Sequence, residues 1–407
     1  MGKIRTRNQY QAEFVKCIQK FGGKYQTWEI FADFISMFAC AISNGIDRVH
    51  FKPREEMYMQ IIRKYTKEEQ AIFPEMMGHV INGMEENRDC DFLGELYMAL
   101  DLGSHWKGQF FTPAEVSMRM AAVENKYPKN QLIRVLDPGA GNGILSFAVI
   151  DKLLRSGYKR LDITLIETDK EILPVLEYTI TKIRQICESY HAECFIHYVD
   201  QNFILWESSY LYDIVICNPP YMKVRKDSVE ATAMKTYVYG QPNLYGLFMA
   251  KAIELLCDNG QYIFITPRSW TSGKYFTKVR NFLQKELNIK EIDLFSSRDE
   301  VFQGEKVLQE TMILYGEKGQ IQNEKIKINI LKDGTLDIGN SFWAAADQIK
   351  FKGSEQYLLL PENENDLKII DIMSDMTDSF ESSGYHFKTG PVVEFRNLEH
   401  IHAQTHI

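Results

Sequence analysis

The sequence lacks the features that mark several special classes of protein. Its seven cysteines include no Cys-x-x-Cys pair, no secretory signal opens the chain, and no apolar run approaches the ~20 residues of a membrane-spanning helix. Repeats and low-complexity tracts are also absent. Scattered cysteines of this kind are typical of a reducing compartment, so the sequence predicts a cytoplasmic protein that does not enter a membrane.

Neither sign of charge dominates. The 407 residues hold 47 Lys and Arg against 55 Asp and Glu, which gives a formal net charge of −8, and 45% of them are hydrophobic. A chain of this length has room for two or three domains with sizeable cores. Because the whole molecule is weakly acidic, a polyanion such as a nucleic acid would have to be met by a local basic face.

The pattern of the sequence predicts three regions. Residues 1–105 form a helical region, in which apolar residues follow a possible cap at Thr27 and precede a stop at Gly45. Residues 106–330 alternate strands with helices, and residues 331–407 are a weakly patterned extension. The apolar residues at helical spacing in the first region are Trp28, Phe31, Ile35, Phe38 and Ile42.

Short apolar runs alternate with helical stretches in the middle region. The strand candidates are 133–137, 162–167, 194–200, 213–217, 262–266, 292–295 and 311–315, and the helical stretches are 144–155, 170–188 and 244–257. This alternation predicts an α/β, Rossmann-like fold with a mainly parallel, seven-stranded sheet that is covered on both faces. No clear helix joins the last two candidates, so we expect the last strand to run antiparallel, with 325–331 as an edge strand.

A glycine-rich loop follows the first strand. In VLDPGAGNG (135–143), Gly139, Gly141 and Gly143 leave the backbone open to a ligand after Asp137. A dinucleotide fingerprint would need glycine at Ile144, and the Lys-Ser/Thr pair of a phosphate-binding P-loop is missing. The loop is therefore not built for a pyrophosphate, and mere turn geometry remains the alternative.

Acidic residues follow the next two strands. Glu167 is suited to accept hydrogen bonds from two ribose hydroxyls, and Asp200 could accept from an adenine amino group while Phe203 lies against the ring. Each acid alone could equally be a helix cap or a solvated loop residue. Together with the glycine loop they predict a nucleoside site at the carboxyl edge of the sheet, where open α/β folds bind ligands.

The fourth strand ends in Asn218-Pro219-Pro220-Tyr221. The prolines hold a rigid corner, in which the Asn218 side-chain oxygen and the Pro219 carbonyl could accept both hydrogens of an aromatic amine. The amine lone pair could then attack an electrophilic methyl group in line. Tyr221 offers a flat face for a base turned out of its helix. The alternative is a tight turn that only closes a strand.

These motifs resemble the gamma-type, N6-adenine DNA methyltransferases of bacterial restriction–modification systems. GQFFTP (108–113), DPGAGNG (137–143) and NPPY (218–221) stand in the order of that family. Similarity also covers 243–256 and 260–270 and continues weakly to 389–396. The resemblance implies that the region of alternating strands and helices has the fold of the S-adenosylmethionine-dependent methyltransferases. It also implies methyl transfer to adenine N6 in double-stranded DNA.

The resemblance also implies roles for particular residues. Phe111, Thr112 and Pro113 would close over the methionine part of S-adenosylmethionine, and Asp137, Gly139, Gly141, Gly143, Glu167, Asp200 and Phe203 would complete the cofactor site. Asn218 to Tyr221 would be catalytic. Phe302 would stack on the far side of the target base.

Other activities stay open. The same corner serves methylation of cytosine N4, of an RNA base or of a protein glutamine, and the chain could also be a truncated, non-catalytic subunit that binds cofactor or DNA. Methylation of cytosine C5 requires a cysteine nucleophile, usually after proline, and no cysteine here follows one. We predict no metal site, because the tail histidines His400, His402 and His406 have no fixed acidic or cysteine partner.

Family members of this layout carry a large target-recognition domain after a segment such as 389–396. Here only 11 residues follow Arg396. We therefore expect recognition by a separate specificity subunit, by the helical region, or not at all in a truncated chain, and an associated restriction endonuclease is a further possible partner. Basic residues such as Lys223, Arg225 and Lys226 could contact phosphates, which positions DNA without reading its sequence.

Overall fold

The computed structural model of the protein describes residues 8–46, 51–86, 92–100, 112–170, 172–295, 310–319, 324–331, 338–350, 356–378 and 382–385. The chain up to Asn363 is one compact unit, and the chain from Glu364 on is a second, which contains the helix α14 (Glu364–Ser374). Within the described ranges, no helix combines the length and apolar character that a membrane crossing requires.

In the first hundred residues, the described ranges 8–46, 51–86 and 92–100 are mostly helical. The helices are α1 (Gln9–Gln19), α2 (Thr27–Ile46), α3 (Phe51–Ile62), α4 (Lys67–Gln70), α5 (Ile72–Glu86) and α6 (Phe92–Ala99). The predicted cap at Thr27 is wrong by one residue, because the carbonyl of Gln26 accepts the first helical hydrogen bonds, and α2 continues through Gly45. Phe31, Ile35 and Phe38 enter the core of this region, whereas Trp28 is 52% exposed.

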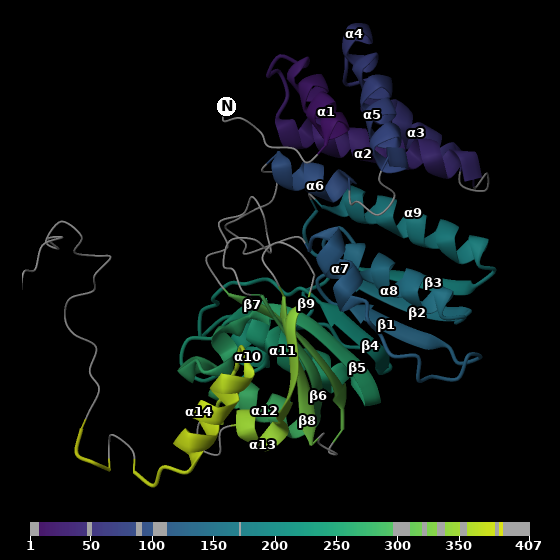
Figure 1. The fold of residues 1–407 in the computed structure, drawn as a ribbon. Helices are drawn as coiled ribbons and strands as arrows, with labels where there is room; N and C mark the ends of the chain where they lie inside the picture. The colour runs from purple at the N-terminus through teal and green to yellow at the C-terminus, as the bar shows by residue number, and fades with distance from the viewer. Residues whose placement is uncertain are drawn as a thin grey trace, which may run out of the picture. The chain divides into compact units, whose positions relative to one another are not determined.

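One mixed sheet forms the centre of the first unit (Figure 1). Its strands are β1 (Ile133–Asp137), β2 (Arg160–Ile166), β3 (Glu193–Val199), β4 (Tyr212–Cys217), β5 (Leu256–Pro267), β6 (Leu287–Phe295), β7 (Thr311–Lys318), β8 (Lys325–Leu331) and β9 (Ile338–Ala345). The order is β3-β2-β1-β4-β5-β7-β6-β8-β9. The first five strands are parallel, and β7 lies antiparallel between β5 and β6, as expected.

The described part of the sheet has nine strands, so the predicted number of seven is too low. β8 is not the edge strand, because β9 pairs antiparallel with it. The sequence did not predict β9, because the side chains of Ile338 and Trp343 in this strand are exposed, while only Phe342 and Ala344 are buried. Polar and apolar residues therefore do not alternate in the usual way.

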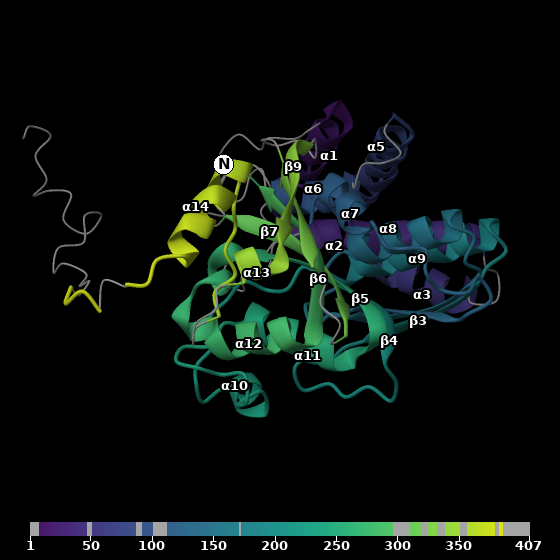
Figure 2. The same ribbon diagram turned by 60° about the horizontal axis from the view of Figure 1, so that its bottom comes forward.

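Helices cover both faces of the sheet (Figures 1 and 2). On one face α8 (Ile144–Arg155) and α9 (Leu173–Ser189) share a core with the odd-numbered positions of β1, while α11 (Leu244–Leu255) and α12 (Thr277–Glu286) lie on the other face. The remaining helices are α7 (Ala114–Met120), α10 (Val229–Ala233), α13 (Ala346–Ile349) and the short 3-10 turns Arg268–Thr271 and Lys274–Phe276.

The helical region packs on α9. Ile172, Val175 and Tyr178 belong to the same core as α1, α2 and α5, and the rings of Phe38 and Tyr178 lie 5.4 Å apart. The N-terminal helices therefore support α9, which begins beside the carboxyl edge of β2.

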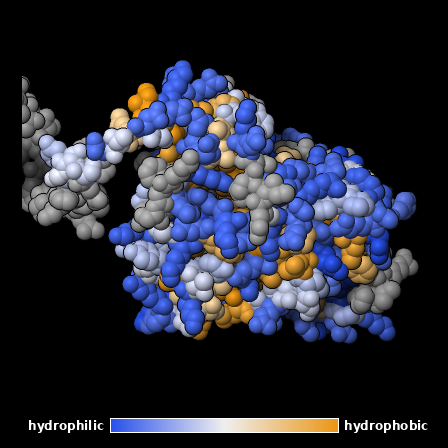
Figure 3. All heavy atoms as spheres, turned by 90° about the horizontal axis from the view of Figure 1, so that it is seen from below, coloured by the Kyte–Doolittle hydropathy of each residue, from blue (hydrophilic) through white to orange (hydrophobic). Residues whose placement is uncertain are grey.

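On the face seen from below, polar side chains predominate and apolar ones form small separate groups (Figure 3).

Candidate functional site

A cavity of about 350 Å³ opens at the carboxyl ends of β1, β2 and β4. Its volume falls within the range of roughly 300–1,000 Å³ that is usual for small-molecule sites. Several loops and two helices contribute to its wall. The lining residues are Thr112, Pro138 to Asn142, Ile144, Leu145, Ile166 to Thr168, Ile172, Gln201 to Phe203, Asn218 to Pro220, Leu244 and Phe248.

The glycine loop forms the floor of this cavity. Gly141 and Gly143 have φ angles of 53° and 81°, in the left-handed region that favours glycine. A Cβ at Gly143 would lie 2.9 Å from Leu176 Cδ1, so this glycine lets α8 approach α9, and it does not line the cavity. Gly139 lines the cavity, and a Cβ there would meet the Asn218 carbonyl at an ordinary 3.5 Å, so this glycine is not needed to avoid a clash.

Asp137 lies beneath the loop rather than in the cavity wall. Its side chain is fully buried, and Ser146 Oγ donates a hydrogen bond of 2.8 Å to its Oδ2. Burial raises the pKa of Asp137 to about 7, against the opposing effect of hydrogen bonds from Ser146 and Gly139. Asp137 therefore connects the end of β1 to the first turn of α8.

Glu167 connects the second strand to the glycine loop. Its Oε2 accepts a 2.9 Å hydrogen bond from the N–H of Gly141, and its Oε1 accepts from the N–H groups of Thr168 and Asp169 at 2.7 and 2.8 Å. Burial raises the pKa of Glu167, although these three bonds favour the charged form. A carboxylate has about four acceptor sites. About one remains for a ligand hydroxyl in this arrangement.

The two residues predicted to hold an adenine ring lie in different places. Phe203 is buried, lines the cavity and packs against Phe248 with 4.9 Å between ring centroids. Asp200 does not line the cavity; its side chain is 44% exposed, and its carboxylate forms an ion pair with Lys170. Phe203 can therefore contact a ligand ring directly, whereas Asp200 would first have to leave Lys170.

The Asn-Pro-Pro corner faces the glycine loop across the cavity. Asn218, Pro219 and Pro220 all line it, directly after the fully buried β4. Asn218 Nδ2 donates a 3.1 Å hydrogen bond to Thr112 Oγ1. Thr112 of the GQFFTP motif therefore contacts Asn218 of the NPPY motif in one wall of the cavity, although the two residues are 106 positions apart in the chain.

Tyr221 stands beside the cavity and does not line it. Its hydroxyl donates a 3.2 Å hydrogen bond to the carbonyl of Ile265, and its ring packs edge-on against Tyr245. Tyr245 in turn stacks on Phe276 at 5.1 Å. The Tyr221 ring is thus held in a fixed plane next to the corner.

Two of the predicted site residues, Phe111 and Phe302, lie outside the described residues. Pro113 is described; it directly precedes α7 and is not part of the cavity wall. Leu244 and Phe248 line the cavity from the first turns of α11 and were not predicted as site residues. Their spacing of four residues after the polar Asn243 was the available signal, because such residues share one face of a helix.

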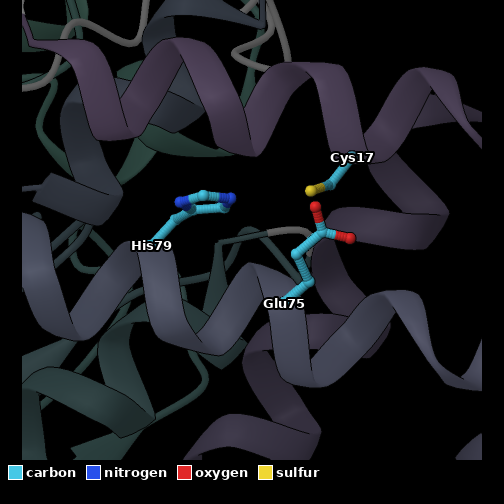
Figure 4. Close-up of side chains that lie close together, drawn as sticks. All are labelled: Cys17, Glu75 and His79. Atoms are coloured by element: carbon cyan, nitrogen blue, oxygen red, sulfur yellow. The ribbon is translucent and has the colours of Figure 1, made fainter.

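A separate cluster of metal-ligand types lies in the helical region. Cys17 of α1 faces Glu75 and His79 of α5, and their ligand atoms lie within 4.8 Å of one another (Figure 4). Lys20 Nζ, however, is 2.6 Å from both carboxylate oxygens of Glu75. Burial also raises the pKa of Cys17 to about 11, so the thiol remains protonated and is a poor ligand at neutral pH.

The strand order, the glycine loop and the position of the cavity define a class I S-adenosylmethionine-dependent methyltransferase fold. A Listeria monocytogenes protein assigned to that class aligns with 81% of this chain and 94% of its own, at 16% identity and a TM-score of 0.53. The structure of a DrdV–DNA complex covers 87% of this chain and 43% of that chain, at 15% identity and a TM-score of 0.59.

By sequence, the chain is similar to restriction–modification methyltransferases. Residues 160–302 match the Eco57I restriction-modification methylase family. The Type II methyltransferase M.BsuBI of Bacillus subtilis is 31% identical over 302 residues, which are 72% of this chain and 60% of that protein. M.PstI of Providencia stuartii is 27% identical over 307 residues, 72% and 59% of the two chains. The chain thus spans about 60% of the length of these relatives.

Proposed function

We propose that this chain is the methyltransferase part of a restriction–modification system and transfers a methyl group from S-adenosylmethionine to adenine N6 in double-stranded DNA. The observation that carries the proposal is the shared cavity wall, in which Asn218 and Pro219 face the glycine loop. An amine whose hydrogens are accepted by these two oxygens would have its lone pair directed toward the loop.

The residues present fit the proposed cofactor. The bare backbone at Gly139 leaves space, Glu167 retains an acceptor for a ribose hydroxyl, and Phe203 offers a flat ring to adenine. When bound, S-adenosylmethionine supplies a methyl group on a positively charged sulfur. Asn218 and Pro219 would hold the target amine by its hydrogens, and Tyr221 would stack on the base beside them.

Adenine is proposed over cytosine because asparagine stands at position 218, where the cytosine N4 enzymes of the resembled family more often carry serine. DNA is proposed over RNA or protein because of the relation to Type II methyltransferases. A target-recognition element, on this protein or on a separate subunit, would choose the site, and a restriction endonuclease would act on the same sequence in the cytoplasm.

The test is methyl transfer from a labelled donor to duplex DNA, RNA and a protein pool, followed by digestion of the labelled DNA to nucleosides. We expect label in duplex DNA, recovered as N6-methyladenosine in its deoxy form. Label in N4-methylcytosine would replace the proposed base, and label in protein alone would overturn the proposal.

A further inference from the structure

Thr112 and Asn218 form a contact that has a consequence for catalysis. Thr112 is 5% exposed, and its Oγ1 accepts the 3.1 Å hydrogen bond from Asn218 Nδ2. Both residues line the same cavity. The Thr112 hydroxyl therefore contacts the Asn218 carboxamide directly, within the wall of the cavity.

The two ends of a carboxamide have opposite hydrogen-bonding character. In the proposed function, Asn218 must present its oxygen to the target amine, because its nitrogen would bring two donors against the donors of the amine. With Nδ2 bound to Thr112, the planar group directs Oδ1 to the other side. A threonine hydroxyl can accept this bond and still donate its own hydrogen to a polar group in the cavity.

The structure also holds Thr112 in place. It precedes Pro113 at the start of α7, and the Pro113 carbonyl accepts a 2.9 Å hydrogen bond from the N–H of Ser117. Arg119, on the same helix, binds the fully buried Asp293 of β6 through Nε at 2.7 Å. A rigid helix tied to the sheet can fix a side chain more sharply than a free loop can.

We propose that Thr112 is a positioning residue, whose hydroxyl fixes the orientation of the Asn218 carboxamide so that its oxygen meets the target amine. The proposal rests on the proposed function for the identity of that amine. The contact between the two side chains does not depend on it. Thr112 thus has a role beyond contact with the cofactor.

The test compares wild type with Thr112→Val, which keeps the shape of the side chain, and Thr112→Ser, which keeps the hydroxyl. Thr181→Val, on the outer side of α9, is the matched control. Methyl transfer to DNA gives kcat, and calorimetry gives donor affinity. Spectra of protein with ¹⁵N-labelled asparagine report the Asn218 amide, whose signal is identified by its loss in Asn218→Ala.

We expect Thr112→Val to lower kcat roughly tenfold, the size of one lost hydrogen bond, with little change in donor affinity. Its Asn218 amide signal should shift, and Thr112→Ser should restore both the signal and the rate. An unchanged amide signal or rate in Thr112→Val overturns the proposal, as does a loss of rate that only follows a loss of donor affinity. If Thr112→Val unfolds, Thr112→Ala replaces it in the same comparison.

The two proposals fail in different ways. A wild-type protein that transfers no methyl group to DNA would refute the proposed function, and the amide signal would still show whether Thr112 orients Asn218. If the wild-type protein methylates adenine but the Asn218 amide signal does not change in Thr112→Val, only the positioning role of Thr112 is refuted.

Discussion

Arg119 on α7 binds both oxygens of the fully buried Asp293 on β6, through Nε at 2.7 Å and Nη2 at 2.8 Å. Asn329 of β8 donates to the same carboxylate at 2.7 Å, and the hydroxyl of Tyr315 donates to it at 3.2 Å. The helix that follows Thr112 is thereby connected to strands β6, β7 and β8.

Removing the arginine should leave a buried carboxylate without its cation. We expect Arg119→Met to lower the free energy of unfolding by about 3–5 kcal/mol, the usual cost of breaking a buried ion pair. Arg155→Met on α8 is the matched control, because the Arg155 side chain is 67% exposed in its pair with Asp151 and exposed pairs contribute about 0–1 kcal/mol. Urea unfolding measures both. Equal losses would show that the network contributes no more than a surface pair.

The buried Asp137 predicts a pH dependence of stability. Its pKa is raised from 3.8 to about 7, so the folded state favours the protonated form, and this contribution to stability is fully present below pH ~4 and lost as pH rises through about 7. Asp137→Asn has no such proton. The free energy of unfolding of the variant should therefore rise relative to that of wild type between pH 4 and 8, by up to about 4 kcal/mol. Parallel curves would contradict the raised pKa.

A comparison of two glycines with similar φ angles distinguishes the energetic cost of a strained backbone from the cost of overpacking. Gly157 has a φ of 88° with nothing within 4 Å of an added Cβ, whereas Gly143 has a φ of 81° with Leu176 Cδ1 at 2.9 Å. Gly157→Ala should cost about 1–2 kcal/mol from the left-handed backbone alone. Gly143→Ala should cost a further ~1–3 kcal/mol from overpacking and should weaken donor binding by moving the loop. Denaturant unfolding and calorimetry check both effects.

The catalytic role of the corner is tested at Asn218. Asn218→Ala should lower kcat by roughly 10²–10³-fold, as the loss of one preorganised hydrogen-bonding group does, and should leave donor affinity nearly intact. Asn340→Ala, an exposed position on β9, controls for the substitution. A rate near that of wild type would remove Asn218 from the mechanism.

Tyr221 has both a ring and a hydroxyl that could matter. Tyr221→Phe removes the hydrogen bond to Ile265 and keeps the ring, so methyl transfer should stay within a few-fold of wild type. Tyr221→Ala should weaken productive binding of DNA by about 1–3 kcal/mol, the range measured for a base stacked on an aromatic residue. Equal losses in both variants would assign the effect to the hydroxyl instead.

Much of the fold could be predicted because central strands such as β1 and β4 are buried on both faces. Continuous apolar runs such as those of β1 and β4 are a local property, and both runs appear in the structure almost as predicted. β9 escaped prediction because an edge strand buries few side chains. The antiparallel β7 was predicted from the missing helix before it, which is again a property of neighbouring residues.

By itself the sequence determined the strand–helix alternation, the glycine loop and the rigid proline corner, because each depends on residues close together in the chain. Only the tertiary structure decided that Thr112 meets Asn218, that Asp137 lies beneath the loop, and that Asp200 pairs with Lys170 outside the cavity. Those relationships depend on how distant segments pack, and the direction of a side chain at a strand end is not encoded in local pattern.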